Sequence, residues 1–204
     1  MGFYGEQILP RFIDVMLGTR EFAKVRREAT AGLHGDVLEI GFGSGLNLAY
    51  LPKEVTGVWT VDPSAVAMKL AAKRIAAAPV AVEIGGLDGE HLDFPDGRFD
   101  AALSTMTLCT IPDVEGALAE VRRVLKPGAY LHFAEHGRSP EMKVARTQDR
   151  FNRLQNVCAG GCNLNRDINE LMMKAGFEIE TVRNFYLKGP KAVGYMAVGK
   201  ARKA

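Results

Sequence analysis

Short apolar runs recur along the middle of the chain, and each ends in small or polar residues. They lie at 36–40, 58–62, 80–84, 99–104 and 130–134. Short apolar runs bounded by turn residues predict buried strands. Helical spacing of apolar residues is found between them, from about Leu46 onward, at 64–78 and at 113–125. Strands that alternate with helices predict a parallel, doubly wound α/β sheet.

The last third of the chain predicts a different arrangement. A polar, helical insertion is expected over 138–165, followed by a helix over 167–175 that Gly176 ends. Strands are predicted at 177–187 and 194–200, with only 188–193 between them. Because a parallel crossover needs a dozen or more residues, these two strands are expected to form an antiparallel hairpin at the sheet edge.

Apolar residues at helical spacing also run through the N-terminal stretch. We expect Pro10 and Gly18 to split this stretch into two helices. An amphipathic helix of this kind can lie on a membrane surface or pack on its own domain as a flap. The polar face mixes acidic and basic residues, which favours the flap.

Composition and charge indicate an ordinary soluble domain. The chain has 204 residues, of which 47% are hydrophobic and 25% charged, and 26 Lys and Arg face 24 Asp and Glu. This charge balance gives no reason to expect a nucleic-acid partner. We therefore expect one domain over 1–204, divided into an N-terminal helical flap (1–34), a core (35–137), the helical insertion (138–165), and a final helix with the edge hairpin (166–204).

The expected location is the cytoplasm. The odd count of three Cys residues is typical of a reducing compartment. No apolar stretch approaches the roughly 18 residues that a membrane span needs, and the N-terminus lacks the pattern of a secretion signal. Stable membrane insertion is therefore not expected, and the sequence does not indicate an oligomeric state.

A glycine-rich loop between the first strand and the next helix is the strongest chemical signal. It contains Gly41, Gly43 and Gly45 and follows Glu39. Glycines there permit a tight turn and let a ligand approach the backbone. An acidic residue beside them would repel a pyrophosphate and attract an amine. Asp62 ends the second strand, where a carboxylate can accept hydrogen bonds from ribose hydroxyls, so the pair suits adenosine with an amino-acid tail.

A third carboxylate suits the same ligand. Asp88, followed by Gly89, comes after the third strand and could accept a hydrogen bond from an adenine amino group. The alternative is that Asp88 is only a turn residue.

Five segments together resemble a class I S-adenosylmethionine-dependent methyltransferase. They are Glu39 to Gly45, Asp62-Pro63-Ser64, Leu87 to Glu90, Phe94 to Asp100, and Arg123 to Gly128. The resemblance implies a three-layer, Rossmann-like sheet of seven strands with the last one antiparallel, and S-adenosylmethionine as cofactor. It implies that Glu39 and the glycines hold the methionine end, Asp62 the ribose, and Asp88 and Gly89 the adenine, with Thr105 near the methyl sulfonium. Asn47, Pro63 and Ser64 complete the expected cofactor-binding residues.

A narrower resemblance links the chain to the mammalian membrane-anchored thiol S-methyltransferases. It is carried by Leu46-Asn47-Leu48, Leu108-Cys109-Thr110, Glu135-His136, the stretch from Gly161 to Asp167, and Gly194-Tyr195. It implies a small-molecule acceptor, with a thiol as one candidate. The chain shows no long hydrophobic anchor, so the membrane location does not carry over. Its insertion has Asn152, Arg153 and Gln155 where the family has aromatic residues and an Asp-Pro pair.

His136 is the candidate catalytic residue. It follows the fifth strand at the ligand-binding edge, where a histidine can accept a proton near neutral pH. The alternative is a structural His that bonds to the insertion's backbone. Cys158 and Cys162 are four residues apart, but no second Cys pair accompanies them, so no metal site is expected. Cys109 is expected in the core, and Arg166 either attracts an anionic substrate or pairs with an acid.

Three other functions compete with a small-molecule methyltransferase. A phospholipid or other lipid acceptor is open within the same class. A nicotinamide oxidoreductase would require a Tyr-x-x-x-Lys motif, which the chain does not contain. A non-catalytic cofactor-binding partner protein would retain the carboxylates and transfer nothing. In the leading hypothesis, the N-terminal helices and the insertion form a lid that excludes water.

Overall fold

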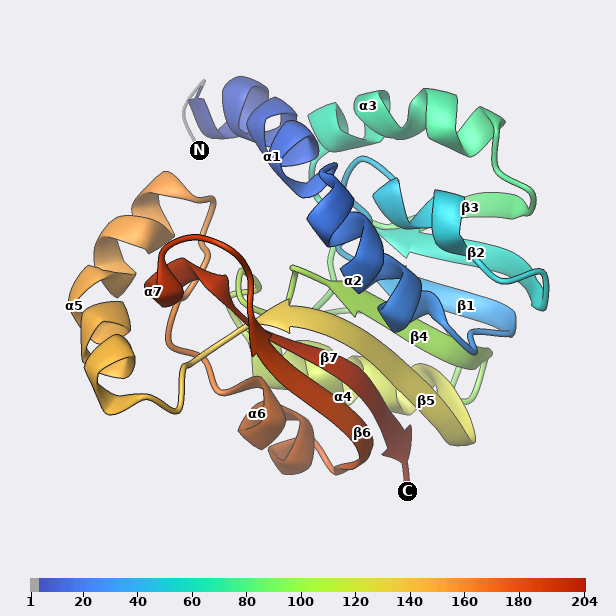
Figure 1. The fold of residues 1–204 in the computed structure, drawn as a ribbon. Helices are drawn as coiled ribbons and strands as arrows, with labels where there is room; N and C mark the ends of the chain where they lie inside the picture. Colours follow the sequence, from blue (N-terminus) through green and yellow to red (C-terminus); the bar gives the residue numbers. More distant parts are fainter. Residues whose placement is uncertain (1–3) are drawn as a thin grey trace.

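The structure is a computed structural model that describes residues 4–204, so the first three residues of the expected flap lie outside it. Its centre is one seven-stranded sheet (Figure 1). Across the sheet the strands run in the order β3 (Ala81–Gly86), β2 (Val55–Val61), β1 (Gly35–Ile40), β4 (Phe99–Thr105), β5 (Leu125–His136), β7 (Tyr195–Lys203) and β6 (Phe177–Tyr186). β7 is antiparallel to both β5 and β6, which confirms the predicted fold class and edge hairpin.

The register brings the carboxyl ends of the central strands to one edge. Ile40, the last residue of β1, pairs with Val61 of β2 and with Ser104 of β4. Glu39 therefore lies one residue inside this edge, while Asp62 and Thr105 lie at the ends of the neighbouring strands. In a doubly wound sheet, ligands bind at this edge, beside the point where the strand order reverses.

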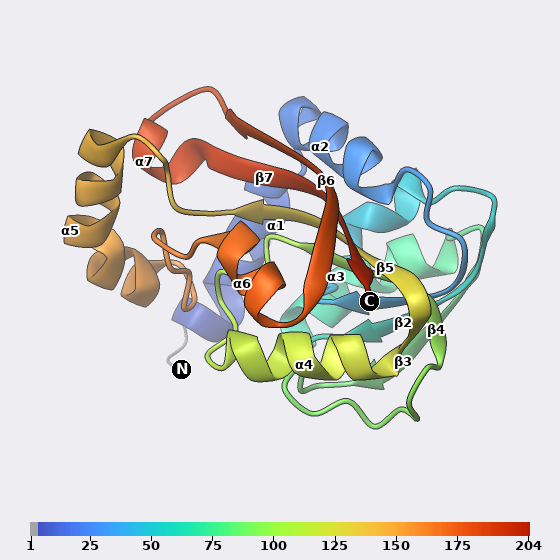
Figure 2. The ribbon, with the colours of Figure 1, turned by 90° about the horizontal axis from the view of Figure 1, so that it is seen from below.

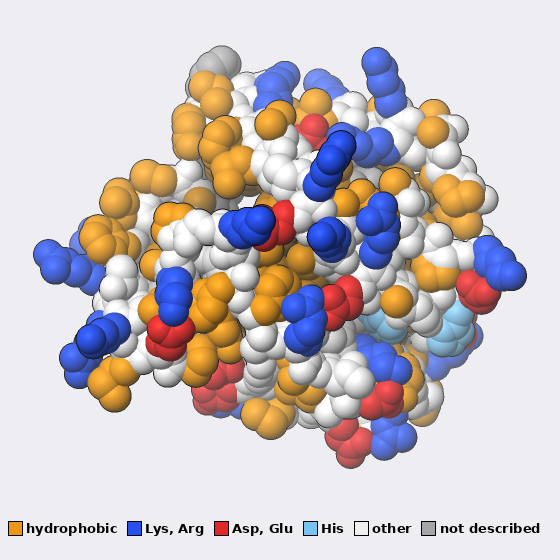
Figure 3. All heavy atoms as spheres, viewed as in Figure 1, with side chains coloured by type: hydrophobic (Ala, Val, Ile, Leu, Met, Phe, Trp, Pro, Cys, Tyr) orange, Lys and Arg blue, Asp and Glu red, His pale blue; other side chains and the backbone are white. Residues whose placement is uncertain are grey.

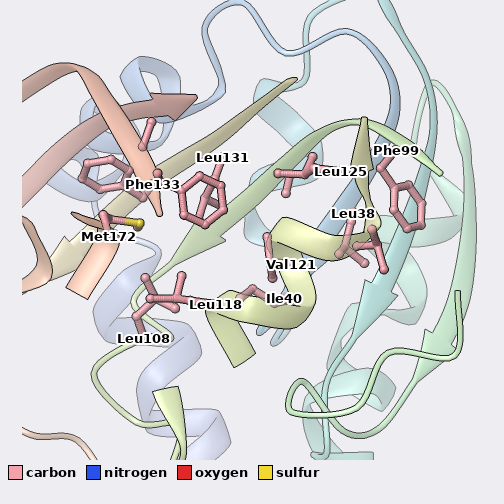
Figure 4. Close-up of a cluster of buried hydrophobic side chains, with 14 of the residues drawn as sticks. Leu38, Ile40, Phe99, Leu108, Leu118, Val121, Leu125, Leu131, Phe133 and Met172 are labelled. Carbon is pink, nitrogen blue, oxygen red and sulfur yellow. The ribbon is translucent and has the colours of Figure 1, made fainter. Parts of the chain in front are cut away.

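Helices cover both faces of the sheet and make three layers (Figure 2). α4 (Val114–Val124) and α6 (Ile168–Lys174) pack on one face, where Leu118, Val121 and Met172 are fully buried against β4 and β5 (Figure 4). α2 (Arg20–Thr30) and α3 (Ala65–Ala76) cover the other face. Among the described helices, side-chain oxygens cap α3, α4 and α6, as at Asp113, which accepts a hydrogen bond from the Gly116 amide at 3.0 Å.

The start of the N-terminal stretch, up to the end of α1, and the insertion lie beyond the ligand-binding edge (Figure 1). The N-terminal stretch forms a π-turn (Tyr4–Ile8) that runs directly into α1 (Leu9–Leu17). The insertion contains α5 (Met142–Cys158), and a short helix α7 (Lys191–Gly194) joins β6 to β7. Within residues 4–204, no helix combines the length and the apolar character that crossing a bilayer requires.

Two predictions about helices were wrong. Pro10 does not break the N-terminal helix, because it occupies the first turn of α1, where the missing N–H costs nothing; the break falls at Gly18 alone. The helix expected from Leu46 is only a 3₁₀ turn, Leu46–Tyr50. Pro52 explains this, because proline disfavours helical backbone at the residue before it, and Leu51 is extended.

Candidate functional site

A buried polar network lies beneath the glycine loop. The side-chain amide of Asn47 donates to Glu39 Oε1 at 2.7 Å and to Thr105 Oγ1 at 2.9 Å. Arg26, from α2, donates through Nη1 to Asn47 Oδ1 at 2.7 Å and to Thr105 Oγ1 at 3.2 Å. The network thus joins β1, β4, the 3₁₀ turn and an N-terminal helix, and it includes three of the predicted cofactor-binding residues.

The carboxyl group of Glu39 is buried in this network, and only one of its two oxygens accepts a hydrogen bond from the described residues. Burial raises the pKa of its carboxyl to about 7, although the Asn47 hydrogen bond and the nearby Arg26 charge act in the opposite direction. Its second oxygen, Oε2, is buried and has no hydrogen-bond partner among the described residues. Buried polar atoms are usually paired, so this oxygen marks a place that a ligand amine could fill.

The glycine loop presents two glycines with different surroundings. Gly41 has φ +69°, and a Cβ there would lie 1.8 Å from Thr107 Oγ1. Gly43 has φ +56°, and a Cβ there would meet nothing within 4 Å. Gly41 is therefore required by the protein's own packing, whereas the backbone at Gly43 faces open space that a ligand can approach.

Asp62 is fixed at the end of β2 by backbone amides. Its carboxylate accepts hydrogen bonds from the Gly43 amide at 2.7 Å and from the Ser64 amide at 2.8 Å. Ser64 in turn caps α3, and Pro63 is exposed between them. Burial raises the pKa of Asp62. Because each carboxylate oxygen can accept two hydrogen bonds, both retain capacity for hydroxyl donors.

Asp88 follows β3 on an exposed loop, where its contacts are those of a turn. Its Oδ1 accepts a hydrogen bond from the Glu90 amide at 2.8 Å, and its Oδ2 lies 3.3 Å from His91 Nδ1, with 59% of the side chain exposed. Gly89 lies next to it in the same loop. No described contact joins Asp88 to Glu39 or Asp62. Its contacts are those of a turn residue, and its exposed carboxylate can still accept a further hydrogen bond.

The N-terminal segment reaches across the glycine loop. Ser44, between two of the loop glycines, donates its hydroxyl to Asp14 of α1. Arg74 of α3 pairs with Asp14 at 2.9 Å and donates to the Ser44 carbonyl at 2.9 Å. Near the chain start, the Tyr4 hydroxyl donates to the Cys158 carbonyl at 3.1 Å, where α5 ends.

His136 ends β5 and is 2% exposed. Its Nδ1 lies 4.0 Å from Cys162 Sγ, and its Nε2 is buried without a hydrogen-bond partner among the described residues. No hydrogen bond to the insertion's backbone is seen for its ring. Cys162 Sγ is in turn 3.6 Å from Cys109 Sγ, so the structure brings together two cysteines and a histidine that the sequence left apart.

The loop after β4 is held by buried charged groups. Glu135 accepts hydrogen bonds from the Thr107 amide at 2.9 Å and the Leu108 amide at 3.1 Å, and burial raises its pKa to about 7. The Arg166 guanidinium donates to three backbone carbonyls of the same loop, those of Leu108, Ile111 and Pro112. Both interpretations of Arg166 were therefore incomplete, since its hydrogen bonds hold the loop that carries Cys109.

Sequence reasoning missed several of these residues. The pairing partner of Cys162 is Cys109, whereas Cys158 is exposed. Arg26 is one of the basic residues among the apolar positions of the N-terminal stretch, where a solvated polar face is expected, but it is only 6% exposed. A signal for Arg26 existed, because it lies four residues after Phe22 and three before the buried Ala29, on one helix face. Nothing in the spacing of Cys109 and Cys162 could have paired them.

Two hollows of the described surface lie away from the glycine loop. One of about 670 Å³ opens beside Gly137 and Met142, and one of about 230 Å³ lies beside Glu28 and His132. Neither is lined by Glu39, Asp62 or Asp88. Each hollow has one carboxylate in its lining, and it already has a partner, because Glu28 pairs with Arg183 and Asp167 caps α6.

Known methyltransferases are similar to this chain in sequence and in fold. Residues 38–133 match a family described as a methyltransferase domain. The chain is 26% identical over 214 residues to the human thiol S-methyltransferase TMT1A, across 94% of this chain and 80% of that protein. It is 27% identical over 125 residues to a phosphatidylethanolamine N-methyltransferase from Cereibacter sphaeroides, across 60% of this chain and 61% of that enzyme. A SAM-dependent methyltransferase structure from Methanosarcina mazei is 26% identical, with a TM-score of 0.64 over 82% of this chain and 92% of that one.

The residues at the sheet edge fit S-adenosylmethionine. Glu39 Oε2 has no partner and can face an ammonium group, Gly43 leaves its backbone open, and Asp62 retains acceptor capacity. The strand order, the glycine loop and the relatives agree on the same enzyme class. The chain is a class I S-adenosylmethionine-dependent methyltransferase, and it resembles the mammalian thiol S-methyltransferases.

Proposed function

We propose that this enzyme binds S-adenosylmethionine along the carboxyl ends of β1, β2 and β3. Glu39 holds the ammonium group; Asn47 donates to its carboxylate and also to Thr105, which is expected near the methyl sulfonium. Asp62, with the Pro63–Ser64 turn, holds the ribose. Asp88 and Gly89 receive the adenine, and the loop glycines Gly41, Gly43 and Gly45 let the backbone come close to the ligand. The observation that carries this assignment is the unpartnered, buried Glu39 oxygen.

We propose a small molecule with a thiol group as the methyl acceptor. The similarity to the human thiol S-methyltransferase supports it, because the match covers most of both chains. The bound cofactor supplies an electrophilic methyl group on a sulfonium. His136 would accept the proton that the acceptor thiol loses when the cofactor's methyl group is transferred to its sulfur. A free thiol ionises with a pKa of about 8.5, so a neutral imidazole nearby assists near pH 7.

His136 suits the role of this base through its Nε2 atom. That nitrogen is buried and free of hydrogen-bond partners among the described residues, whereas Nδ1 faces Cys162. In a buried site, fixing the acceptor sulfur in line with the methyl group contributes more than proton removal, because alignment replaces a bimolecular encounter. The turn that precedes α1 contacts the end of α5 through the Tyr4 hydroxyl and the Cys158 carbonyl, and this contact can help to exclude water.

The test is methyl transfer from radiolabelled S-adenosylmethionine to a panel of thiols, amines and phenols. We expect transfer to thiols, and calorimetric binding of the cofactor that is lost in Asp62→Ala. Asp93→Ala is the matched control, because Asp93 is exposed and lies outside the proposed site. Equal cofactor affinity in the two variants would remove Asp62 from the site. Transfer to amines or phenols alone would exclude a thiol as the methyl acceptor.

A lipid acceptor is the second candidate, and exposed apolar side chains favour it. Phe12 and Val15 of α1 are 57% and 74% exposed, and Leu154 and Val157 of α5 are 61% and 74% exposed. Figure 3 shows apolar side chains gathered over both helices, with Lys and Arg side chains projecting beside α5. Neighbouring apolar and basic groups are typical of surfaces that contact lipid headgroups. Running the same panel with phosphatidylethanolamine liposomes separates the two, since a lipid enzyme would label the liposome fraction.

Two further results bear on the remaining candidate functions, a non-catalytic binding protein and a nicotinamide oxidoreductase. Cofactor binding without transfer to any acceptor, liposomes included, would favour a non-catalytic binding protein. A spectrophotometric titration with NADH is expected to show no response, because an acidic side chain at Glu39, beside the glycine loop, would repel a pyrophosphate.

A further inference from the structure

Cys109, His136 and Cys162 converge in space from three separate parts of the chain. Cys109 follows β4, His136 ends β5, and Cys162 follows α5. Their ligand atoms all lie within 4.8 Å of one another. Cys109 and His136 are each 2% exposed, and Cys162 is half-buried. Two thiols and an imidazole are the donors that zinc and other thiophilic cations prefer.

Two of the three separations between these atoms are close to those around one tetrahedral ion. Two Zn–S bonds of about 2.3 Å at a tetrahedral angle place the sulfurs about 3.8 Å apart, and a Zn–S and a Zn–N bond place S and N about 3.6 Å apart. The structure has 3.6 Å between the two Sγ atoms and 4.0 Å between Cys162 Sγ and His136 Nδ1. A disulfide needs its sulfurs about 2.05 Å apart and leaves the histidine without a role.

The backbone around the two cysteines is held as a rigid frame. Asn163, next to Cys162, donates its amide N–H to the Cys109 carbonyl at 2.8 Å and its side-chain N–H to the same oxygen at 3.0 Å. Asn156 of α5 donates to the Gly161 carbonyl at 2.7 Å, and Arg166 holds the loop of Cys109 from the other side. Ligands fixed in this way need little reorganisation to bind an ion.

The charges around the cluster balance when a divalent cation is present. Two thiolates would neutralise a divalent ion, so a site of two thiolates and one neutral imidazole carries no net charge with the ion bound. We propose that Cys109, His136 and Cys162 bind one thiophilic cation of the Zn²⁺ class, with three protein ligands and a fourth position for a sulfur or oxygen donor from solution.

This site shares His136 with the proposed methyl transfer, but the evidence for the metal does not rest on that proposal. Coordination through Nδ1 would keep a proton on Nε2 of His136, so the base proposed above belongs to the metal-free protein. No metal site was expected from the sequence, because Cys158 and Cys162 are the only closely spaced cysteines and no second Cys pair accompanies them. The readouts below are of binding, so their outcome does not depend on finding an acceptor.

The test uses the full chain, reduced and stripped of metal, with Co²⁺ as a spectroscopic probe and Zn²⁺ in competition with a chromophoric chelator. We expect one equivalent bound, thiolate-to-cobalt charge-transfer absorption, and the intense visible bands of a tetrahedral site. Cys162→Ser should weaken Zn²⁺ binding by more than about 100-fold, since loss of a direct ligand exceeds the effect of an outer partner. Cys158→Ser is the matched control, because its thiol is exposed and outside the cluster.

Several results would overturn the proposal. These are wild-type protein without a charge-transfer band, Cys162→Ser protein with unchanged affinity, or an equal loss in Cys158→Ser. A Cys109–Cys162 disulfide in the isolated protein, with no metal uptake after its reduction, would also overturn it. Thermal unfolding of the metal-free variants checks folding, and the wild-type cobalt spectrum decides the question even where Cys109→Ser, in the core, does not fold.

Discussion

Burial and ligand binding impose opposite demands on Glu39. The folded, ligand-free protein raises the pKa of this carboxyl from 4.5 to about 7, because burial penalises the charge. A cofactor ammonium group would need the same carboxyl ionised. The protein therefore accepts a destabilised group in its free form, as sites that bind charged ligands commonly do.

Glu39→Gln is expected to separate these two demands. At pH 8 the ligand-free variant should be more stable than the wild type by up to about 3 kcal/mol, because no buried charge forms. At pH 4.5 the difference should vanish, since the wild-type carboxyl is then protonated. Affinity for S-adenosylmethionine should fall by about 100-fold or more. Chemical denaturation and calorimetry measure the two effects, and the exposed Glu54→Gln should show neither.

Arg26 carries a second residue-level prediction. Arg26→Met removes the donor to Asn47 and Thr105 and the cation near Glu39, so it should cost about 2–4 kcal/mol of unfolding free energy. Arg27→Met, at the exposed neighbouring position, should cost under about 1 kcal/mol. Equal effects in urea denaturation would contradict the role of the network.

Residues at the ends of strands could be predicted from the sequence, whereas their partners could not. Glu39 and Asp62 follow from a local pattern, an apolar run that ends in an acid beside glycine or a turn. Arg26 meets Asn47 and Thr105 only after a helix has packed on the sheet. An arginine in an amphipathic helix is usually solvated, and the tertiary contacts decide the exception.

At the scale of an element, the glycine loop combines a packing constraint with a binding surface. Gly41→Ala should destabilise the protein by more than about 2 kcal/mol, because the new Cβ would overlap Thr107 in addition to the strain of positive φ. Gly43→Ala should cost only about 1–2 kcal/mol, from φ alone, yet weaken cofactor binding, because its Cβ would fill the open face. Thermal unfolding and calorimetry on both variants distinguish the two glycines. A Gly43→Ala protein with wild-type affinity would place the cofactor elsewhere.

The helix α1 gives a prediction about the lid. Asp14→Asn should loosen α1 from the glycine loop, since it removes the charge that pairs with Arg74. Global stability should change by less than about 1 kcal/mol, because the pair is partly exposed. Amide hydrogen exchange in α1 should be several-fold faster than in the wild type, while exchange in α4 stays unchanged. Unaltered exchange in α1 would show that Asp14 does not anchor it.

At the scale of the molecule, the sequence predicted the sheet because each strand and helix is marked locally. Alternating apolar runs and helices indicated the parallel part, and the short 188–193 connection required the antiparallel hairpin. The Cys109–His136–Cys162 cluster has no such mark. Cys109 and Cys162 are separated by α4, β5 and α5, so only the folded topology brings them together.

Titration of the whole molecule gives the last prediction. Glu39 and Glu135 both have folded-state pKa values of about 7, above their ordinary 4.5, so stability is fully present below pH 4.5 and is lost as pH rises toward 7. Glu120, held at about 2 by Arg123, acts oppositely: its contribution is present above pH 4.5 and lost on acidification. Burial lowers the pKa of His132, so the contribution of this group to stability is lost as pH falls below 6.5. In this pH range it is one group that acts against two, Glu39 and Glu135.

The ligand-free protein should therefore be most stable between about pH 4.5 and 6 and should weaken toward pH 8. Saturating S-adenosylmethionine should move this optimum upward, because an ammonium group favours the ionised form of Glu39. Thermal unfolding from pH 3 to 9, with and without cofactor, measures the shift. Since the cofactor amine does not contact Glu135 in the proposed site, Glu135→Gln should flatten the ligand-free profile yet retain the cofactor-dependent shift. Glu39→Gln should flatten the profile to a similar degree and should also lose the shift. A ligand-free melting temperature that rises steadily from pH 5 to 8 would mean that neither carboxyl is held as the structure holds it.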